Sequence, residues 1–335
     1  MIEQRNEHTI AAACSVSGRG YWSGREVTVA LQPAPAMTGI RFIRSDLRGR
    51  PSCPAHAGAA SGVAMRTNLA RGPAKFQMVE HLMAALSALE IDNCLVCVDG
   101  EELPGLDGSA LPYVEALQQA GLVIQASPRA CLVIQDTITV QDGAASIVAS
   151  PSEGFTCTYE YHLDYGSESP IRNGAFRIGM TPHAFSRQVA SARTFVTEEQ
   201  ARQIRQAGHA SHVTNRDLLV IGTEGPIENR YRYRDECVRH KVLDLIGDLG
   251  MVGTQLIGRF VSHRGGHRLN HRMSLELMER IAAAPATSYP FRIFGGEDNA
   301  TGATPKPMTR EPRVPQDPIS KRRPNALRPR RRRAA

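Results

Sequence analysis

The chain of 335 residues lacks any long hydrophobic run. A membrane-spanning helix needs about 20 consecutive, mostly apolar residues, so we expect no transmembrane segment. The first residues, 1–8, are polar and partly acidic, whereas a secretory signal needs a basic start followed by an apolar run. These two absences argue against membrane insertion and export, and we expect the protein in the cytoplasm.

The cysteines form neither a disulfide framework nor a zinc module. They are seven, an odd number, scattered, and mostly set in apolar strand-like runs. Cys94 and Cys97 make one C-x-x-C pair without a second pair, and residues three apart in a strand point to opposite faces. We therefore predict reduced cytosolic thiols.

Residues 301–335 have few acidic and few large apolar side chains. They carry eleven Lys and Arg, two acidic residues and seven prolines, a net charge of +9 against +7 for the whole chain. Residues 1–300 are therefore nearly neutral, at −2. A segment so poor in apolar surface cannot offset its ordering entropy, so we predict a disordered basic tail. Its charge favours an acidic partner, nucleic acid or anionic lipid, or it is a solvated extension without a ligand.

The overall composition, 41% hydrophobic and 22% charged, is that of a globular protein. The length exceeds what one hydrophobic core usually serves. A polar, proline-bearing break at 126–129 separates two parts, 1–126 and 127–300, and in each part strand patterns precede two helix patterns. We therefore predict an α+β fold with two domains, and a monomer.

Apolar periodicity locates the individual elements. An amphipathic helix is expected over 75–89. Ser109, Pro112 and Gly121 indicate the N-cap, first turn and end of a second helix. Further helices are expected over 198–206, 234–249 and 268–282. Strands are expected over 24–32, 94–98, 131–135, 137–140, 145–149, 155–161 and 217–221.

Three polar residues recur at four-residue spacing in the helix expected over 234–249. His240, Asp244 and Asp248 therefore share one helical face. An imidazole and a carboxylate one turn apart can supply two metal ligands, leaving positions for a third ligand and a water molecule. A solvated helix face has the same spacing, so spacing alone leaves both interpretations open.

A second polar pair, Glu80 and His81, interrupts an otherwise apolar helical pattern. A core histidine would explain His81 but not the carboxylate beside it. Adjacent helix positions diverge by about 100°, so His81 could bind a metal while Glu80 reaches a water molecule. Two glycines place His267 at the start of the next helix, where it is a further candidate, although a histidine in a turn is otherwise ordinary.

Five ordered stretches resemble those of one known family. They are Val79-Glu-His-Leu-Met-Ala-Ala-Leu86, Leu103-Pro-Gly-Leu-Asp-Gly-Ser109, Ala192-Arg-Thr-Phe195, Val238-Arg-His-Lys-Val-Leu-Asp-Leu-Ile-Gly-Asp-Leu249 and Gly266-His-Arg-Leu-Asn270. The chain is similar in them to the UDP-3-O-acyl-N-acetylglucosamine deacetylases of lipid A biosynthesis. The resemblance implies two α+β domains, each a sheet with two helices, with the helices packed between the sheets and the active site at the domain junction. It also implies release of acetate from the N-acetyl group of UDP-3-O-acyl-N-acetylglucosamine.

The same resemblance implies roles for the polar residues above. His81, His240 and Asp244 would bind zinc, and Fe²⁺ could occupy the same ligands. Glu80 would be the general base that takes a proton from water. His267 would be the second acid–base group.

Four further residues receive supporting roles from the resemblance. Asp248 would orient the acid–base histidine, and the Thr194 hydroxyl would stabilise the oxyanion. Lys241 would meet the diphosphate side of the substrate, and Phe195 would pack on its sugar.

Two departures from the family affect substrate binding rather than the reaction. Trp22 stands where the family usually has a histidine, and 211–216 replaces a Gly-Ser-rich segment. Acyl length preference and action on a related N-acyl sugar nucleotide therefore stay open. A non-enzymatic alternative is a scaffold that acts through the basic tail, but a scaffold has no need for a carboxylate beside a buried histidine.

Overall fold

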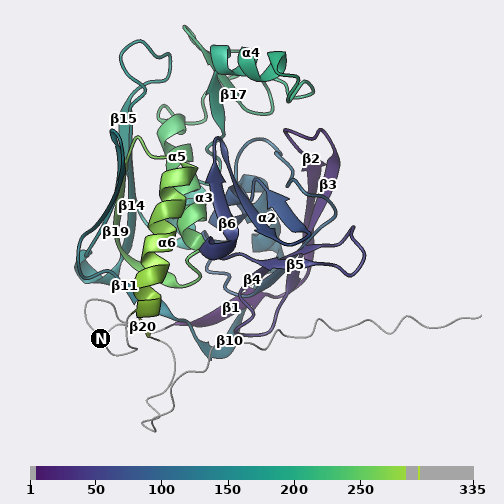
Figure 1. The fold of residues 1–335 in the computed structure, drawn as a ribbon, viewed down its shortest axis with the longest axis vertical. Helices are drawn as coiled ribbons and strands as arrows, with labels where there is room; N and C mark the ends of the chain where they lie inside the picture. The colour runs from purple at the N-terminus through teal and green to yellow at the C-terminus, as the bar shows by residue number, and fades with distance from the viewer. Residues whose placement is uncertain (1–4, 284–292, 295–335) are drawn as a thin grey trace, which may run out of the picture. The chain divides into compact units, whose positions relative to one another are not determined.

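The computed structural model describes residues 5–283, 293 and 294, and its helices and strands form a mixed α+β fold (Figure 1). The tail predicted over 301–335 lies outside these residues. Among the described helices, none combines the length and apolar character needed to cross a membrane.

The first part of the chain contains a five-stranded sheet. Its strands, in spatial order, are β2 (Cys14–Arg19), β3 (Glu26–Pro33), β9 (Cys94–Val98), β4 (Ile40–Arg44) and β5 (Ser52–Pro54). In β3 the buried residues Val27, Val29 and Leu31 alternate with more exposed ones. The period of two explains why this segment is a strand with one face on the core.

The second part contains a seven-stranded sheet around β19 (Gln255–His263), which pairs with β13, β11 and β14. The other strands are β11 (Cys131–Val133), β12 (Ile138–Asp142), β13 (Ala145–Ser150), β14 (Cys157–Leu163), β15 (Gly174–Gly179) and β20 (Ile293–Phe294).

Smaller sheets complete the framework of the site. One has β6 (Ala60–Val63), β7 (Arg66–Arg71) and β8 (Ala74–Gln77). Another has β16 (Phe195–Thr197), β17 (Leu219–Gly222) and β18 (Gly225–Pro226), with α4 (Glu198–Gln206) following β16. The ribbon of β1 (Asn6–Ile10) and β10 (Leu122–Pro128) joins the start of the first part to its end.

Besides α4, four described helices have nine or more residues. They are α1 (Glu80–Ala88), α2 (Leu111–Ala120), α5 (Glu236–Gly250) and α6 (His267–Ala283), and a short α3 spans Pro182–Gln188. Helix α5 packs against β14 and β15, α6 against β12 and β13 of the same sheet, and α2 against β2 (Figure 1). Helices α1 and α5 pack closely, because a Cβ on Gly247 would lie 2.1 Å from the carbonyl oxygen of Glu80.

Most expected bounds lie within two residues of the observed ones, but the start of one helix and the N-cap of another were wrong. The helix expected over 75–89 begins only at Glu80, because Ala74–Gln77 pairs with β7 and Met78 has a φ of 60°. The apolar helical period begins at Val79, so the residues before it had no periodic support. Ser109 is not the N-cap of α2, since Ala110 occupies that position, although the Ser109 hydroxyl accepts the Leu111 N–H.

Candidate active site

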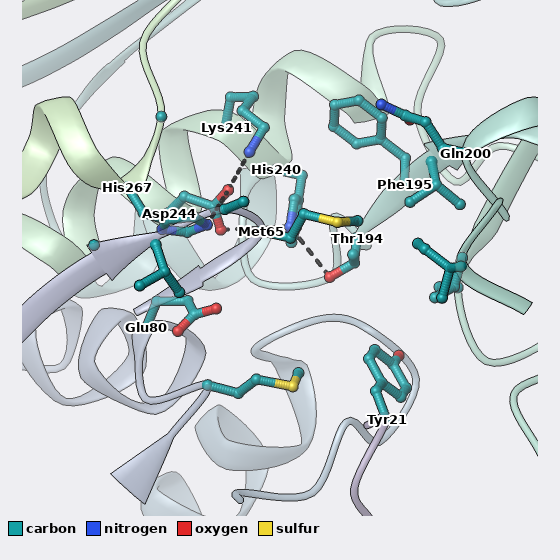
Figure 2. A pocket seen from close by; sticks show the side chains of 18 of the residues that line it. Tyr21, Met65, Glu80, Thr194, Phe195, Gln200, His240, Lys241, Asp244 and His267 are labelled. Atoms are coloured by element: carbon teal, nitrogen blue, oxygen red, sulfur yellow. Dashed lines mark hydrogen bonds and ion pairs between the residues drawn. The ribbon is translucent and has the colours of Figure 1, made fainter. Parts of the chain in front are cut away.

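A cavity of about 900 Å³ is lined by residues from both parts of the chain. Its polar end includes Glu80, Asp244 and His267, which lie together in Figure 2, whereas Tyr21 and Phe195 lie toward the other side. Helix α1 supplies the first of these residues, α5 the second and α6 the third. The site therefore depends on how three helices meet, which local sequence patterns do not specify.

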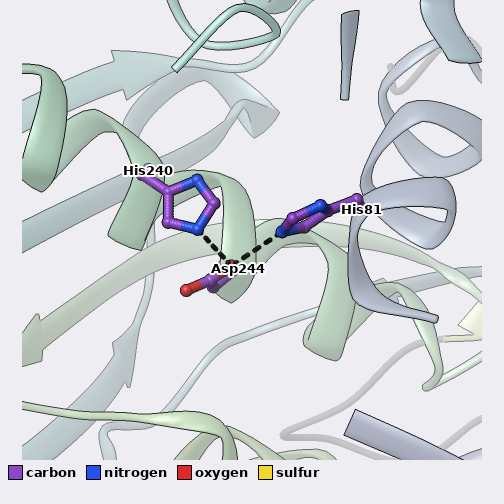
Figure 3. A group of neighbouring side chains, drawn as sticks. All are labelled: His81, His240 and Asp244. Carbon is purple, nitrogen blue, oxygen red and sulfur yellow. Dashed lines mark ion pairs between the residues drawn. The ribbon is translucent and has the colours of Figure 1, made fainter. Parts of the chain in front are cut away.

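The structure brings His81, His240 and Asp244 together (Figure 3). One ligand atom from each lies within 4.8 Å of the others. The Nε2 atoms of the two histidines are 3.8 and 3.4 Å from Oδ1 of Asp244. All three residues are buried, and within the described part of the chain Asp244 Oδ1 has no hydrogen-bond partner. A buried carboxylate oxygen without a donor, facing two imidazole nitrogens, fits a bound cation.

The protonation of these three residues suits metal binding. Burial and the neighbouring His240 lower the pKa of His81 to about 3, and burial also lowers the pKa of His240. Burial acts to raise the pKa of Asp244, but His240 and Lys241 outweigh it and hold this pKa below its usual range. Two neutral imidazoles and a carboxylate are the forms that bind a metal ion.

The loop 192–194 orients His240. The ring Nδ1 donates to the Ala192 carbonyl at 3.1 Å, which leaves Nε2 as the free lone pair. Thr194 Oγ1 lies 3.2 Å from this Nε2 and donates to the Gly108 carbonyl at 3.1 Å. The His240 ring is thus oriented by a backbone carbonyl from a segment that is distant in the sequence.

Lys241 and Phe195 border the metal-site candidate. Lys241 Nζ lies 2.6 Å from Oδ2 of Asp244. His81 and His240 face the other carboxylate oxygen, Oδ1. Although burial opposes it, the Asp244 charge raises the pKa of Lys241 above its ordinary value, so the ammonium persists. The Phe195 ring packs edge-on against His240, with ring centroids 6.1 Å apart.

Glu80 and His267 are the buried titratable groups beside the ligands. Burial, with the charges of Asp248 and Asp244, raises the pKa of Glu80 to about 7. For His267, burial opposes protonation, but the same two carboxylates outweigh it and raise the pKa to about 9. Asp248 holds the ring, because His267 Nδ1 lies 2.9 Å from its Oδ2. Both pKa values are thus raised, that of a carboxyl group and that of an imidazole.

Four supporting residues had no predicted role. Glu236, fully buried at the start of α5, binds Arg193 through Nε at 2.7 Å and so ties the loop 192–194 to that helix. Asn270 donates to Asp248 at 2.9 Å. Arg193 and Asn270 lie in stretches that resemble the family, so a signal existed for both, whereas nothing in the pattern indicated Thr67, which contacts Glu80, Asp248 and His267.

The family sequence profile described as UDP-3-O-acyl N-acetylglycosamine deacetylase matches residues 7–279. The chain belongs to this deacetylase family. A UDP-3-O-acyl-N-acetylglucosamine deacetylase from Thermosynechococcus vestitus is 36% identical over 275 residues, which cover 82% of this chain and 94% of the relative. One from an Anaeromyxobacter species is 35% identical over 294 residues, 88% of this chain and 94% of the relative. The deacetylase family is zinc-dependent, and the cluster of two histidines and Asp244 fits zinc.

The two segments expected to depart from the deacetylase family lie near each other, because Trp22 packs against the cluster that contains Val213. Trp22 has the Arg66 guanidinium 4.5 Å above its ring and His209 edge-on at 6.0 Å. Val213, from the segment 211–216, packs in a cluster with Tyr21. Trp22 and Val213 both line the cavity that also contains Glu80, Asp244 and His267.

Proposed function

We propose that Glu80 and His267 carry the two proton transfers of the deacetylation that defines this family. The chain is a zinc-dependent deacetylase of UDP-3-O-acyl-N-acetylglucosamine in lipid A biosynthesis. The observation that carries the proposal is that one cavity holds a metal-ligand set and, beside it, two buried proton-transfer groups with oppositely suited pKa values.

In this scheme water adds to the acetamide carbonyl and the C–N bond then breaks. His81, His240 and Asp244 would hold the zinc ion, which would supply Lewis acidity to the reaction when bound. Glu80 accepts the proton that water loses. His267 donates a proton to the departing nitrogen, so that acetate and the free amine of the sugar nucleotide result.

The Thr194 hydroxyl has the supporting role at the developing oxyanion. Its single proton is directed at the Gly108 carbonyl in the structure. It must therefore turn away from this carbonyl to donate to the oxyanion. Asp248 keeps His267 oriented and charged.

Substrate contacts are assigned by charge and shape. Lys241, a half-buried ammonium that lines the cavity, meets the diphosphate side of the substrate, and Phe195 packs on the sugar. The acyl chain takes the apolar side, where Tyr21 and Val213 cluster. The alternative substrate is a related N-acyl sugar nucleotide. The observation that favours it is Trp22, which lines the cavity where the family is expected to have a histidine.

The finer architecture is part of the same proposal. We divide the chain into domains at 1–126 and 127–300, each a sheet with two helices, with the helices between the sheets and the site at the junction. The packing of α1 against α5, and of α5 on β14, supports this arrangement. We place the enzyme in the cytoplasm as a monomer.

The direct test is incubation of the purified protein with UDP-3-O-acyl-N-acetylglucosamine while acetate is measured, with and without a zinc chelator. Chelator-sensitive acetate release is expected. Release that persists after full metal removal would contradict the scheme, as would faster turnover of an N-acyl sugar nucleotide that has no 3-O-acyl chain.

A further inference from the structure

Thr67 contacts three of the polar residues around the site. It lies in β7, is 1% exposed, and uses both its backbone and its side chain. Its N–H donates to Oε2 of Glu80 at 2.9 Å. Its hydroxyl donates to Oδ1 of Asp248 at 2.7 Å, and the same oxygen lies 3.2 Å from Nδ1 of His267.

The direction of these hydrogen bonds follows from the number of protons. A hydroxyl has one proton, and Thr67 donates it to the Asp248 carboxylate. Toward His267 the hydroxyl oxygen can then only accept. Nδ1 of His267 must therefore carry a proton, which it shares between Thr67 and Oδ2 of Asp248 at 2.9 Å. This leaves Nε2 of His267 on the side of Asp244, 3.8 Å from its Oδ2.

The hairpin that carries Thr67 also touches the starts of two helices through its backbone. The Thr67 carbonyl accepts the N–H of Val79, the residue before α1, at 3.2 Å. Gly62 pairs with Thr67 across the hairpin, and a Cβ there would lie 2.1 Å from the carbonyl oxygen of His267. The strand pair is thus pressed against the helix ends that present Glu80 and His267.

We propose that Thr67 is a positioning residue that sets Glu80 and His267 relative to each other. The proposal rests on the proposed function, because it assumes the two proton-transfer roles. Thr67 acts through other groups: its N–H orients the Glu80 carboxylate, and its hydroxyl holds the Asp248–His267 pair. Loss of such an outer hydrogen bond typically costs about 10- to 100-fold in activity.

The test compares two substitutions of Thr67. Thr67→Val keeps the branched shape and the N–H but removes the hydroxyl, whereas Thr67→Ser keeps the hydroxyl. For Thr67→Val we expect kcat to fall about 10- to 100-fold, with KM within roughly threefold and zinc still at one per chain. Thr67→Ser should return kcat to within roughly threefold of the parent. If Thr67→Val does not fold, Thr67→Ala replaces it in the test. Alanine also removes the hydroxyl, and it leaves a small cavity instead of introducing a clash.

Thr9→Val is the matched control for loss of a buried threonine hydroxyl. Thr9 is buried, and its hydroxyl donates to the Asn93 carbonyl at 2.7 Å, away from the cavity lining. Its replacement should lower the melting temperature and leave kcat at the parental value. A fall in kcat that merely follows lost stability would appear in both valine variants, and that result would overturn the proposal.

A second measurement separates the positioning role from the proposed function. In a His267→Ala background, Thr67→Val should reduce kcat by less than about twofold, because a residue that acts through an absent group adds little. If Thr67→Val lowers kcat by the same factor in the His267→Ala background as in the parent, the role of Thr67 is overturned. A Thr67→Val enzyme with parental kcat would overturn it as well. A His267→Ala enzyme that keeps the parental rate would instead contradict the proposed function.

Discussion

Gly247→Ala should damage the metal site without changing any ligand. A Cβ at this position would lie 2.1 Å from the Glu80 carbonyl oxygen, against 3.4 Å for ordinary contact, a shortfall of about 1.3 Å between α5 and α1. The clashing atom is backbone, so only separation of the two helices relieves it. Helix α1 carries His81, and α5 carries His240 and Asp244, whereas zinc tolerates ligand distances only to about 0.2 Å. Zinc affinity should therefore fall.

Stability should fall as well, against the trend for helices. In a helix, Ala is intrinsically better than Gly by about 1 kcal/mol, but overpacking of a core costs about 1–3 kcal/mol. We expect a net loss in the free energy of unfolding for Gly247→Ala. Gly250→Ala is the matched control on the same helix, since its Cβ would meet the Ser87 side chain at 3.2 Å and the Met83 carbonyl oxygen only at an ordinary contact distance of 3.7 Å. Zinc per chain and melting temperature, with and without chelator, measure both variants. Full zinc retention by Gly247→Ala at parental affinity would refute the reasoning.

Four further expectations follow from the site and the tail. His240→Ala should lose zinc, whereas Glu80→Ala should keep it while kcat falls by about 10² to 10⁴; zinc analysis beside acetate release distinguishes them, and a zinc-free Glu80→Ala protein would contradict the assignment. Because Glu80 must be ionised and His267 protonated, kcat/KM should fall below a pH near 7 and above one near 9, with bound zinc moving both limbs lower; a flat profile across this range would speak against the pair. Trp22→Ala should raise kcat/KM for longer acyl chains relative to shorter ones, since the indole lines the cavity, and an unchanged ratio would exclude the indole as a determinant of length. Deleting 301–335 should keep acetate release within roughly threefold and weaken binding to anionic vesicles or nucleic acid; loss of catalysis would place the domain boundary elsewhere.

Local patterns identified the elements that have strong periodicity. The strand 94–98 and the helix 198–206 have the bounds expected, and α5 presents His240, Asp244 and Asp248 on one face. These features depend on spacing within a single element. The central strand β19 was missed, because Gly258, Arg259 and Ser262 interrupt its apolar run.

The arrangement of the site required tertiary structure. Thr67 is a single threonine in a short strand, and its three contacts come from residues 13, 181 and 200 positions away in the chain. No periodicity encodes such contacts. The Ala192 carbonyl that orients His240 is a backbone group, which any residue type could supply. Resemblance to a family indicated the stretch that contains Ala192 but not Thr67, and the distances explain what both residues contact.

The split of the proposed metal ligands between α1 and α5 has a consequence for synthesis of the protein. A growing polypeptide that has left the ribosome only as far as α4 contains His81 but neither ligand from α5. One imidazole holds zinc weakly, because tight sites use three or four protein ligands. On the proposed ligand set, tight zinc binding therefore has to wait until α5 has been synthesised. Zinc occupancy therefore indicates that α1 and α5, which are far apart in the sequence, have packed against each other.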